Sequence, residues 1–486
     1  MSKSNIEQQG LLQPESFDLD DLESSGHVPN GHPQHPSEDW SRPRKTWSSS
    51  PRWLRPRWIL IGVATVAALL VVGVALNKGK GFKIPKPSFS PSKPETPQVG
   101  GGSSKKESEG KVKHWEKPKD FKIIGLIFFG RPSVVAILDC YLKRNLVTNG
   151  GWLDEVRFVV NTKKEDDIAY LDELVTGESL YKKIVIENMG YNEVWEHGVD
   201  HENMFIKIDD DIVFFNDEAI PDIVFSKLKH PHSLDVVANL VNSPETGWLH
   251  YRFGAIHAYL PELEPPQNPS ADSKGPIAWR ASKLPEWKGD DMSFPVKGVR
   301  AGKDDDSSVL PPDAEGAAPF EGHRWLPLPG GANKDQELWR TPMKESSYDP
   351  NGPDWGSWSL GAQAHYSFLE NLEKDNLKIY HYGHGVDQDR EGIWNMAYAR
   401  MNINFMAIWG KDVLDNLPFD SPDDEHELSV GVNQKVRRPL LVNTHAIAAH
   451  FSFRSQHEMY QTDLLDRYRA YANEMICTKD NQIKIP

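Results

Sequence analysis

Between residues 121 and 217, short apolar runs typical of buried strands alternate with segments whose apolar residues have helical spacing. Residues 122–129 predict a strand that is apolar throughout after Lys122; it ends at Gly130, Arg131 and Pro132, and helical spacing follows. The pattern predicts strands over residues 122–129, 155–161, 183–187 and from 204 into an acidic triplet, and helices over 134–146, 166–175 and 191–197. This alternation predicts an α/β fold with a mixed, mostly parallel sheet and helices on both faces.

The acidic triplet is the most informative polar feature. Asp209, Asp210 and Asp211 are flanked by Phe, Ile and Val, which places them at the end of a buried strand. Adjacent carboxylates in such a place raise one another's pKa, so a hard divalent cation with oxygen ligands is the economical explanation. A second triplet at residues 304–306 lies among Gly, Lys and Ser, and we expect it to be a solvated loop.

The rest of the chain divides by composition. Residues 1–57 are polar and predict a disordered tail. Residues 58–76 are apolar and uncharged, which predicts one transmembrane helix, with a buried core helix as the alternative. Residues 77–120 are rich in Lys, Pro, Ser and Gly and predict a stem. One large domain follows over residues 121–486, with an irregular insert at about 262–350.

Charge and cysteine content limit the function classes. The formal net charge is −15 without a basic stripe, which argues against a nucleic-acid partner. Cys140 and Cys477 are the only cysteines, so no disulfide scaffold or Cys-based zinc site is available. The two could pair in an oxidising lumen or be free and buried.

Aromatic residues after residue 262 have two interpretations. Trp279, Trp287 and Trp325 could offer flat surfaces to sugar rings or could anchor an irregular loop to the core. Residues 355–365 and 394–400 are expected to begin helical stretches whose aromatic residues belong to the core.

Several stretches carry a family resemblance, namely the acidic triplet and residues 138–146, 150–156, 449–453 and 462–468. Together they resemble GT-A nucleotide-sugar glycosyltransferases, and within these a group of fungal membrane-anchored proteins. The resemblance implies a Rossmann-like GT-A domain in which an Asp-x-Asp motif holds Mn²⁺, or Mg²⁺, against a nucleotide-sugar donor. It also implies that Gly130, Arg131, Asp209 and Asp210 bind the nucleotide sugar.

The resemblance also implies which residues bind the metal and which act in catalysis. Asp209, Asp211 and a histidine from the C-terminal part would complete the metal shell. A spacing of five places His445 and His450 on opposite faces of a strand, so at most one faces the site. Our choice is His450, which lies in the family-like run at residues 449–453, and a structural histidine is the alternative. Asp424 or Glu425 would be the general base of an inverting enzyme, although two carboxylates at a helix start can also serve as caps.

These expectations describe a type II membrane protein of the Golgi or ER with a lumenal catalytic domain. It would transfer a sugar from a nucleotide-sugar donor to a glycan, protein or lipid acceptor. The alternative is a non-catalytic membrane-anchored protein that binds glycans or serves as a scaffold on the same fold. A metal-dependent hydrolase is a third class, but the chain has no His-Glu-x-x-His signature.

Overall fold

The computed structural model describes residues 116–187, 190–267, 275–289, 317–348, 356–384 and 392–483. The predicted tail, the transmembrane span at residues 58–76, nearly all of the stem and the triplet at 304–306 lie outside these residues. Within the described ranges, no helix has the length and apolar character needed to cross a membrane.

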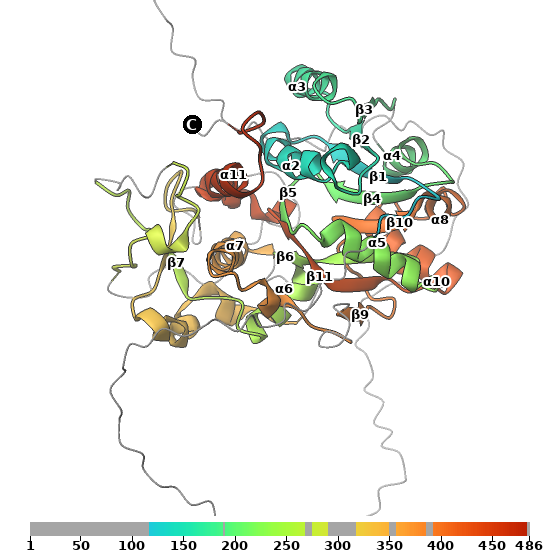
Figure 1. The fold of residues 1–486 in the computed structure, drawn as a ribbon. Coiled ribbons are helices and arrows are strands. Elements are labelled where there is room, and N and C mark those ends of the chain that lie inside the picture. The colour runs from blue at the N-terminus through green and yellow to red at the C-terminus, as the bar shows by residue number, and fades with distance from the viewer. Residues whose placement is uncertain are drawn as a thin grey trace, which may run out of the picture. The chain divides into compact units, whose positions relative to one another are not determined.

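A mixed, mostly parallel sheet forms the centre of the domain (Figure 1). Its strands run in the order β3-β2-β1-β4-β10-β6-β11-β5, and β9 pairs with β11. β10 runs antiparallel to β4 and β6, while β11 is parallel to β6. The strands are β1 (Ile123–Phe129), β2 (Glu155–Val160), β3 (Tyr181–Ile184), β4 (Met204–Asp209), β5 (Ile212–Phe215), β6 (Asp235–Val241), β9 (Ile393–Asn395), β10 (Phe405–Trp409) and β11 (Leu441–His450).

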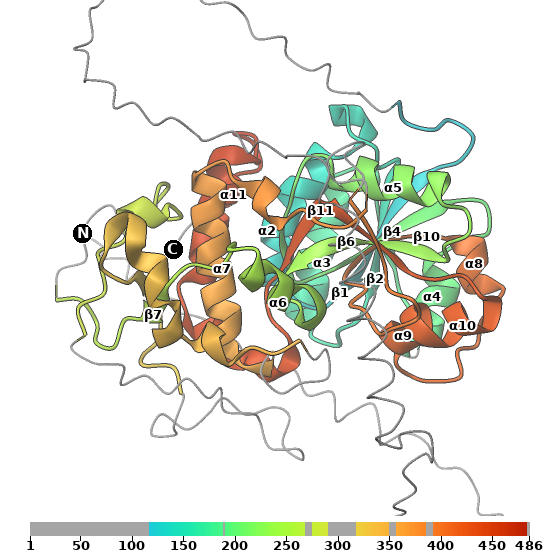
Figure 2. The ribbon, with the colours of Figure 1, turned by 90° about the horizontal axis from the view of Figure 1, so that it is seen from below.

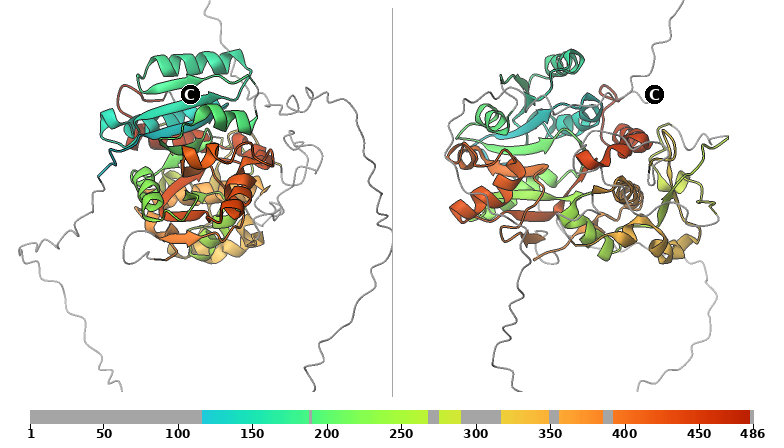
Figure 3. Two further views of the ribbon diagram at one scale, coloured as in Figure 1. Left: turned by 90° about the vertical axis from the view of Figure 1, so that its right-hand side faces the viewer. Right: turned by 180° about the vertical axis from the view of Figure 1, so that it is seen from behind.

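Helices cover both faces of this sheet, as the sequence predicts. One apolar cluster packs one face against α2, α3, α5, α7 and α11, and a second packs the other face against α4, α8 and α10. Figure 2 shows α5 and α10 on opposite sides of the sheet, and Figure 3 shows α3 beside the edge strand β3. The helices are α2 (Pro132–Arg144), α3 (Glu165–Thr176), α4 (Tyr191–Gly198), α5 (Ala219–Lys229), α6 (Pro244–Arg252), α7 (Trp358–Glu373), α8 (Gly410–Leu414), α9 (Asp424–His426), α10 (Val432–Val436) and α11 (Leu464–Met475).

The insert is partly ordered in the described residues. β7 (Tyr259–Pro261) and β8 (Trp325–Pro327) form a two-stranded antiparallel sheet. Short 3₁₀ helices make up much of the rest, namely η4 (Ala281–Lys283), η5 (Gly331–Arg340) and η6 (Pro342–Glu345). Trp279, Trp287 and Trp325 are all buried, so they anchor the insert to the core and do not offer surfaces to a ligand.

One secondary-structure prediction is wrong. Residues 394–400 were expected to begin a helix, but β9 pairs with β11 and the chain then turns. Ala397 and Tyr398 adopt positive φ values of 48° and 64°, which end the strand in a tight turn. Pairing with a sheet edge therefore overrides the helical spacing of the aromatic residues.

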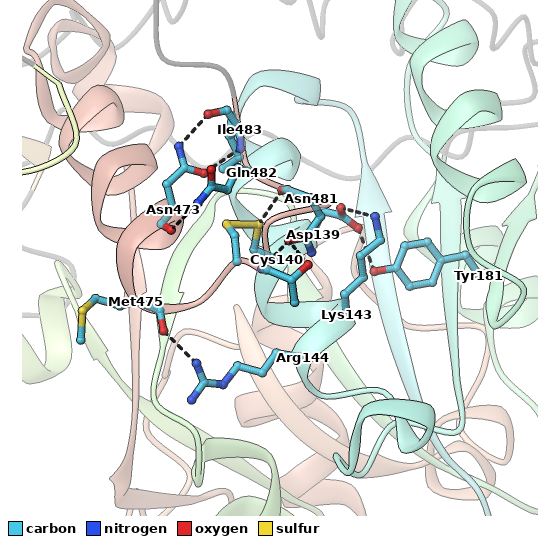
Figure 4. Close-up of a disulfide and its surroundings, with 12 residues drawn as sticks. Asp139, Cys140, Lys143, Arg144, Tyr181, Asn473, Met475, Asn481, Gln482 and Ile483 are labelled. Atoms are coloured by element: carbon cyan, nitrogen blue, oxygen red, sulfur yellow. Dashed lines mark hydrogen bonds and ion pairs between the residues drawn. A yellow bond between two sulfur atoms is a disulfide. The ribbon is translucent and has the colours of Figure 1, made fainter.

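The two cysteines pair. Cys140 on α2 forms a disulfide with Cys477, just beyond α11, across a sequence separation of 337 residues (Figure 4). Around the bond, Arg144 donates to the carbonyl of Met475 at 2.9 Å. The disulfide thus fastens the C-terminal helix to the first helix of the domain.

Candidate active site

The acidic triplet lies where the carboxyl ends of two neighbouring parallel strands meet. β1 pairs in parallel with β4, with Phe128 opposite Asp209. The loop that follows β1, Gly130 and Arg131, therefore comes directly beside the turn that follows β4. Ligands of open α/β sheets bind outside this edge of the strands, so the structure places the triplet where a ligand site is expected.

Asp210 holds the loop that follows β1. Its Oδ2 accepts hydrogen bonds from the backbone N–H groups of Gly130 and Arg131, each at 2.7 Å, and its Oδ1 accepts one from Arg131 Nε at 2.7 Å. The carboxylate is 3% exposed. Three donors on one buried carboxylate fix the loop against the end of β4. The groups that were predicted to bind the nucleotide, Gly130 and Arg131, bond here to Asp210.

Asp211 joins the loop to the C-terminal strand. Its Oδ2 accepts from Arg131 Nη1 at 2.7 Å and lies 2.9 Å from Nε2 of His450, the last residue of β11. Burial alone would raise the pKa of Asp211, but Arg131 and His450 hold this pKa below its ordinary value. Its other oxygen, Oδ1, is buried and makes no hydrogen bond within the described ranges.

Asp209 faces a different set of groups. It forms an ion pair with Lys207 on the same strand and accepts a hydrogen bond from Asn404 Nδ2 at 2.7 Å. Burial would lower the pKa of Lys207, but Asp209 and Asp424 raise it above its ordinary value. Lys207 is therefore a cation at neutral pH and neutralises Asp209.

The predicted metal ligands do not form a three-residue shell. In the part of the chain that the structure describes, no group of three His, Cys, Asp or Glu side chains is arranged to hold a metal ion. Asp211 and His450 meet, but Asp209 turns to Lys207. The sequence argument required a cation to neutralise the triplet, and the structure supplies two from the protein itself, Arg131 and Lys207.

The second acidic group lies at the start of α9, close to Asp209. Asp424 is buried and accepts a hydrogen bond from Trp195 Nε1 at 3.2 Å. Burial raises the pKa of Asp424 to about 6, and Lys207 opposes this rise. The cap of the helix is Asp423, whose Oδ1 accepts from the backbone N–H of His426 at 3.0 Å. Capping therefore does not explain the burial of Asp424.

Glu425 lies in a more strongly paired environment. It forms an ion pair with Arg400 at 2.8 Å and accepts from Asn402 Nδ2 at 2.9 Å. A carboxylate that is fixed by a guanidinium and an amide is less available as a base than Asp424.

The sequence analysis missed Glu245, in the first turn of α6. Ser243 Oγ lies 2.6 Å from Glu245 Oε2 and 2.7 Å from Asn402 Oδ1, but a hydroxyl carries only one hydrogen. The amide of Asn402 is oriented by its bond to Glu425, so its Oδ1 needs the hydrogen of Ser243. Both contacts are satisfied only when Glu245 carries a proton. Burial also raises the pKa of Glu245, to about 7.

The two histidines of β11 have different surroundings. His450 contacts Asp211, whereas the ring of His445 stacks on His381 with a centroid separation of 4.1 Å. His450 is therefore the histidine at the acidic cluster, as the sequence analysis chose. Its function as a metal ligand stays a prediction.

The solved structures compared with this chain are distant likenesses. No protein-family model and no curated protein sequence matches the chain. A structure of GalNAc-T7 with UDP, GalNAc and Mn²⁺ matches at 11% identity over 68% of this chain and 43% of that chain, with a TM-score of 0.32. Glucosyl-3-phosphoglycerate synthase from Mycobacterium tuberculosis, in complex with Mn²⁺, UDP and glucosyl-3-phosphoglycerate, matches at 12% identity over 29% of this chain and 57% of that chain, with a TM-score of 0.22.

A structure of 4-diphosphocytidyl-2C-methyl-D-erythritol synthase also matches, at 12% identity over 32% of this chain and 68% of that chain, with a TM-score of 0.19. The chain spans 41%, 43% and 50% of the first three solved chains that it matches. Likenesses of this size carry no argument about the function of this chain.

Proposed function

We propose that the protein is a metal-dependent glycosyltransferase that transfers a sugar from a nucleotide-sugar donor to a hydroxyl of a glycan, protein or lipid. One observation carries the proposal. A buried carboxyl group with a pKa of about 6, Asp424, lies at the same sheet edge as the cluster of Asp209, Asp211 and His450. Perturbed carboxyl groups at such an edge are candidates for acid–base chemistry.

Asp424 supports the proposal as the general base. With a pKa of about 6 it is mostly ionised at neutral pH and still basic enough to accept a proton. In the proposed step, the O–H bond of the acceptor breaks and its proton passes to the Asp424 carboxylate. The acceptor oxygen forms a bond to the anomeric carbon as the bond from that carbon to the diphosphate breaks. Attack opposite the leaving group inverts the configuration.

Asp211 and His450 are the residues that would hold the metal ion. The buried Oδ1 of Asp211 has no hydrogen-bond partner among the described residues, and a carboxylate oxygen suits both Mn²⁺ and Mg²⁺, whereas an imidazole is the softer ligand of the pair. When bound there, a divalent ion would supply Lewis-acid stabilisation to the charge that develops on the departing diphosphate. Arg131 and Asp210 fix the loop beside it, so they would position the donor.

We extend the proposal to location: a type II protein of the Golgi or ER membrane, with the described domain in the lumen. The Cys140–Cys477 disulfide supports this extension, because disulfides persist in oxidising compartments. Protease added to sealed microsomes should then trim the N-terminal tail and spare residues 121–486. Digestion of the large domain in intact vesicles would reverse the topology.

The test of activity is Mn²⁺-dependent hydrolysis of a panel of nucleotide sugars by the purified full-length protein. Asp211→Asn should abolish metal-dependent donor binding in calorimetry, whereas Asp305→Asn in the second triplet should leave it unchanged. No hydrolysis or binding of any nucleotide sugar by the wild type would refute the proposed function. If the two variants bind the donor equally well, the proposed metal site at Asp211 is wrong, but the proposed glycosyltransferase function is not refuted.

A further inference from the structure

A pocket with a mixed polar and apolar lining lies on the segment that directly follows Asp424. It has a volume of about 330 Å³, within the usual range for small-ligand sites, and the loop around Pro418 forms one wall. The other wall is the helical segment in which α9 continues into one turn of π-helix, η9 (Glu427–Gly431), and then into α10. Single π-turns inside helices are often found at functional sites.

Glu427 is the unusual residue of this pocket. It is 5% exposed, yet its carboxylate has neither a hydrogen-bond nor an ion-pair partner within the ranges that the structure describes. Its oxygens are not fully buried atoms, so the carboxylate opens to the pocket, where it can accept hydrogen bonds from a ligand. The carboxylate lies over Gly431, where an added Cβ would come within 2.7 Å of Glu427 Oε2. Glycine at this position thus leaves room for the carboxylate beside the pocket.

The other ionisable groups of the pocket define the chemistry that it can bind. Asp420 supplies a second acceptor, and Lys435 and His426 supply donors. None of these three side chains forms an ion pair among the described residues. The pocket therefore presents both acceptors and donors that are not already paired. Sugar hydroxyls both donate and accept, so a sugar ring satisfies such a mixed lining better than a simple cation or anion.

The position of the pocket connects it with the proposed reaction. Glu427 follows Asp424 by three residues, and residues three apart on a helix are neighbours, with about 5–6 Å between their Cβ atoms. We propose that this pocket is the acceptor-sugar subsite and that Glu427 accepts hydrogen bonds from hydroxyl groups of the acceptor ring. The inference rests on the proposed function, because Asp424 one turn earlier would receive the proton of the reacting hydroxyl.

The test measures binding of methyl glycosides of glucose, galactose, mannose and N-acetylglucosamine to the full-length protein, by saturation-transfer NMR and calorimetry. Glu427→Gln should weaken binding of the preferred glycoside at least tenfold, because hydrogen bonds to a charged carboxylate are the strong ones. Glu321→Gln, at an exposed position outside the pocket, is the matched control and should bind as the wild type does. Gly431→Ala keeps the charge but displaces the carboxylate, so it should also weaken binding.

Thermal unfolding separates a ligand-binding role from a structural one. Because Glu427 has no partner in the unliganded protein, Glu427→Gln should retain or raise the melting temperature; a marked fall would overturn the proposal. Glycoside binding that is unchanged in Glu427→Gln, or absent in the wild type, would also overturn it. If nucleotide sugars still bind in that case, the proposed function stands without this subsite. If glycosides bind through Glu427 but no nucleotide sugar binds, the proposed function fails and a glycan-binding protein remains.

Discussion

Two groups of carboxylates belong to the same region of the molecule and differ in how their charge is balanced. Asp209, Asp210 and Asp211 at the end of β4 contact Lys207, Arg131 and His450. Glu245, Asp424 and Glu427, in the helical segments that follow β6 and β10, have no direct contact with a basic side chain within the described residues. The first group is neutralised by the protein, and the second is not.

The difference separates two kinds of role. A buried carboxylate that is paired with cations stays ionised, as Asp211 does because Arg131 and His450 lower its pKa. Buried carboxylates without a cation have raised pKa values, as Asp424 and Glu245 do, and can exchange protons near neutral pH. Within the acidic motif Asp210 therefore positions the Gly130–Arg131 loop, Asp211 is the proposed metal ligand, and the acid–base candidates lie elsewhere.

The largest effect is expected from removing the unbalanced carboxylate next to Asp209. Asp424→Asn should lower turnover by about 10²–10⁴, the usual contribution of general acid–base catalysis, and should leave affinity for the donor and the metal unchanged. Steady-state kinetics and calorimetry measure the two quantities separately.

Glu425→Gln is the internal comparison for this rate. Glu425 is ion-paired to Arg400, so its replacement should cost some stability without a selective loss of turnover. A selective loss in Glu425→Gln, with Asp424→Asn near normal, would move the base by one residue. Normal turnover in both would remove the inverting mechanism's support from this helix.

Loss of a cation from the triplet Asp209, Asp210 and Asp211 should lower the stability of the fold. Arg131→Met removes the cation that contacts both Asp210 and Asp211, so it should lower the free energy of unfolding by about 3–5 kcal/mol. Arg469→Met, which breaks an ion pair to the exposed Asp466, should cost at most about 1 kcal/mol. Chemical denaturation measures both.

Adding Mn²⁺ to the Arg131→Met protein tests whether a metal ion or Arg131 is the main counter-charge of the triplet. If a divalent ion were the principal counter-charge of the triplet, adding Mn²⁺ would restore the stability of Arg131→Met to that of the wild type. We expect only partial recovery, because Asp210 would keep the two backbone N–H donors but lose both guanidinium contacts, from Nε and Nη2 of Arg131.

The first half of the sheet could be predicted from sequence because its signals are local. β1, α2, β2, α3, α4 and β4 follow the predicted ranges closely, and β3 begins two residues earlier than its prediction, at Tyr181. Each of these elements has a hydrophobic period of its own, and β1, β2 and β3 pair in chain order, whereas β4 returns to pair with β1. The position of the triplet at the carboxyl edge follows from the same pattern.

The other half depends on contacts between distant segments. The insertion of β10 between β4 and β6, and the pairing of β9 with β11, join strands that are far apart in the sequence. Lys207 lies in the sequence only two residues before Asp209, but its role as the counter-ion requires the side-chain geometry. Glu245 gave no signal at all, because its environment is created by Asn402 from a segment about 160 residues later.

The smallest expected effect concerns the pH dependence of stability at Glu245. Its pKa rises from an ordinary value of 4.5 to about 7 in the folded protein, so the folded state holds its proton over a range in which the unfolded state has released it. This contribution to stability is fully present below pH 4.5 and is lost as the pH rises through about 7, with a slope of up to ~1.4 kcal/mol per pH unit.

Glu245→Gln keeps a donor for Ser243 Oγ without titrating, so it should remove that slope. Denaturation midpoints at pH 5, 6, 7 and 8 measure the difference between variant and wild type, in which contributions from other groups, such as the buried Asp235, cancel. Parallel pH profiles for the two proteins would mean that Glu245 is ionised in the folded state, and the contrast between balanced and unbalanced carboxylates would then be reduced to Asp424 and Glu427.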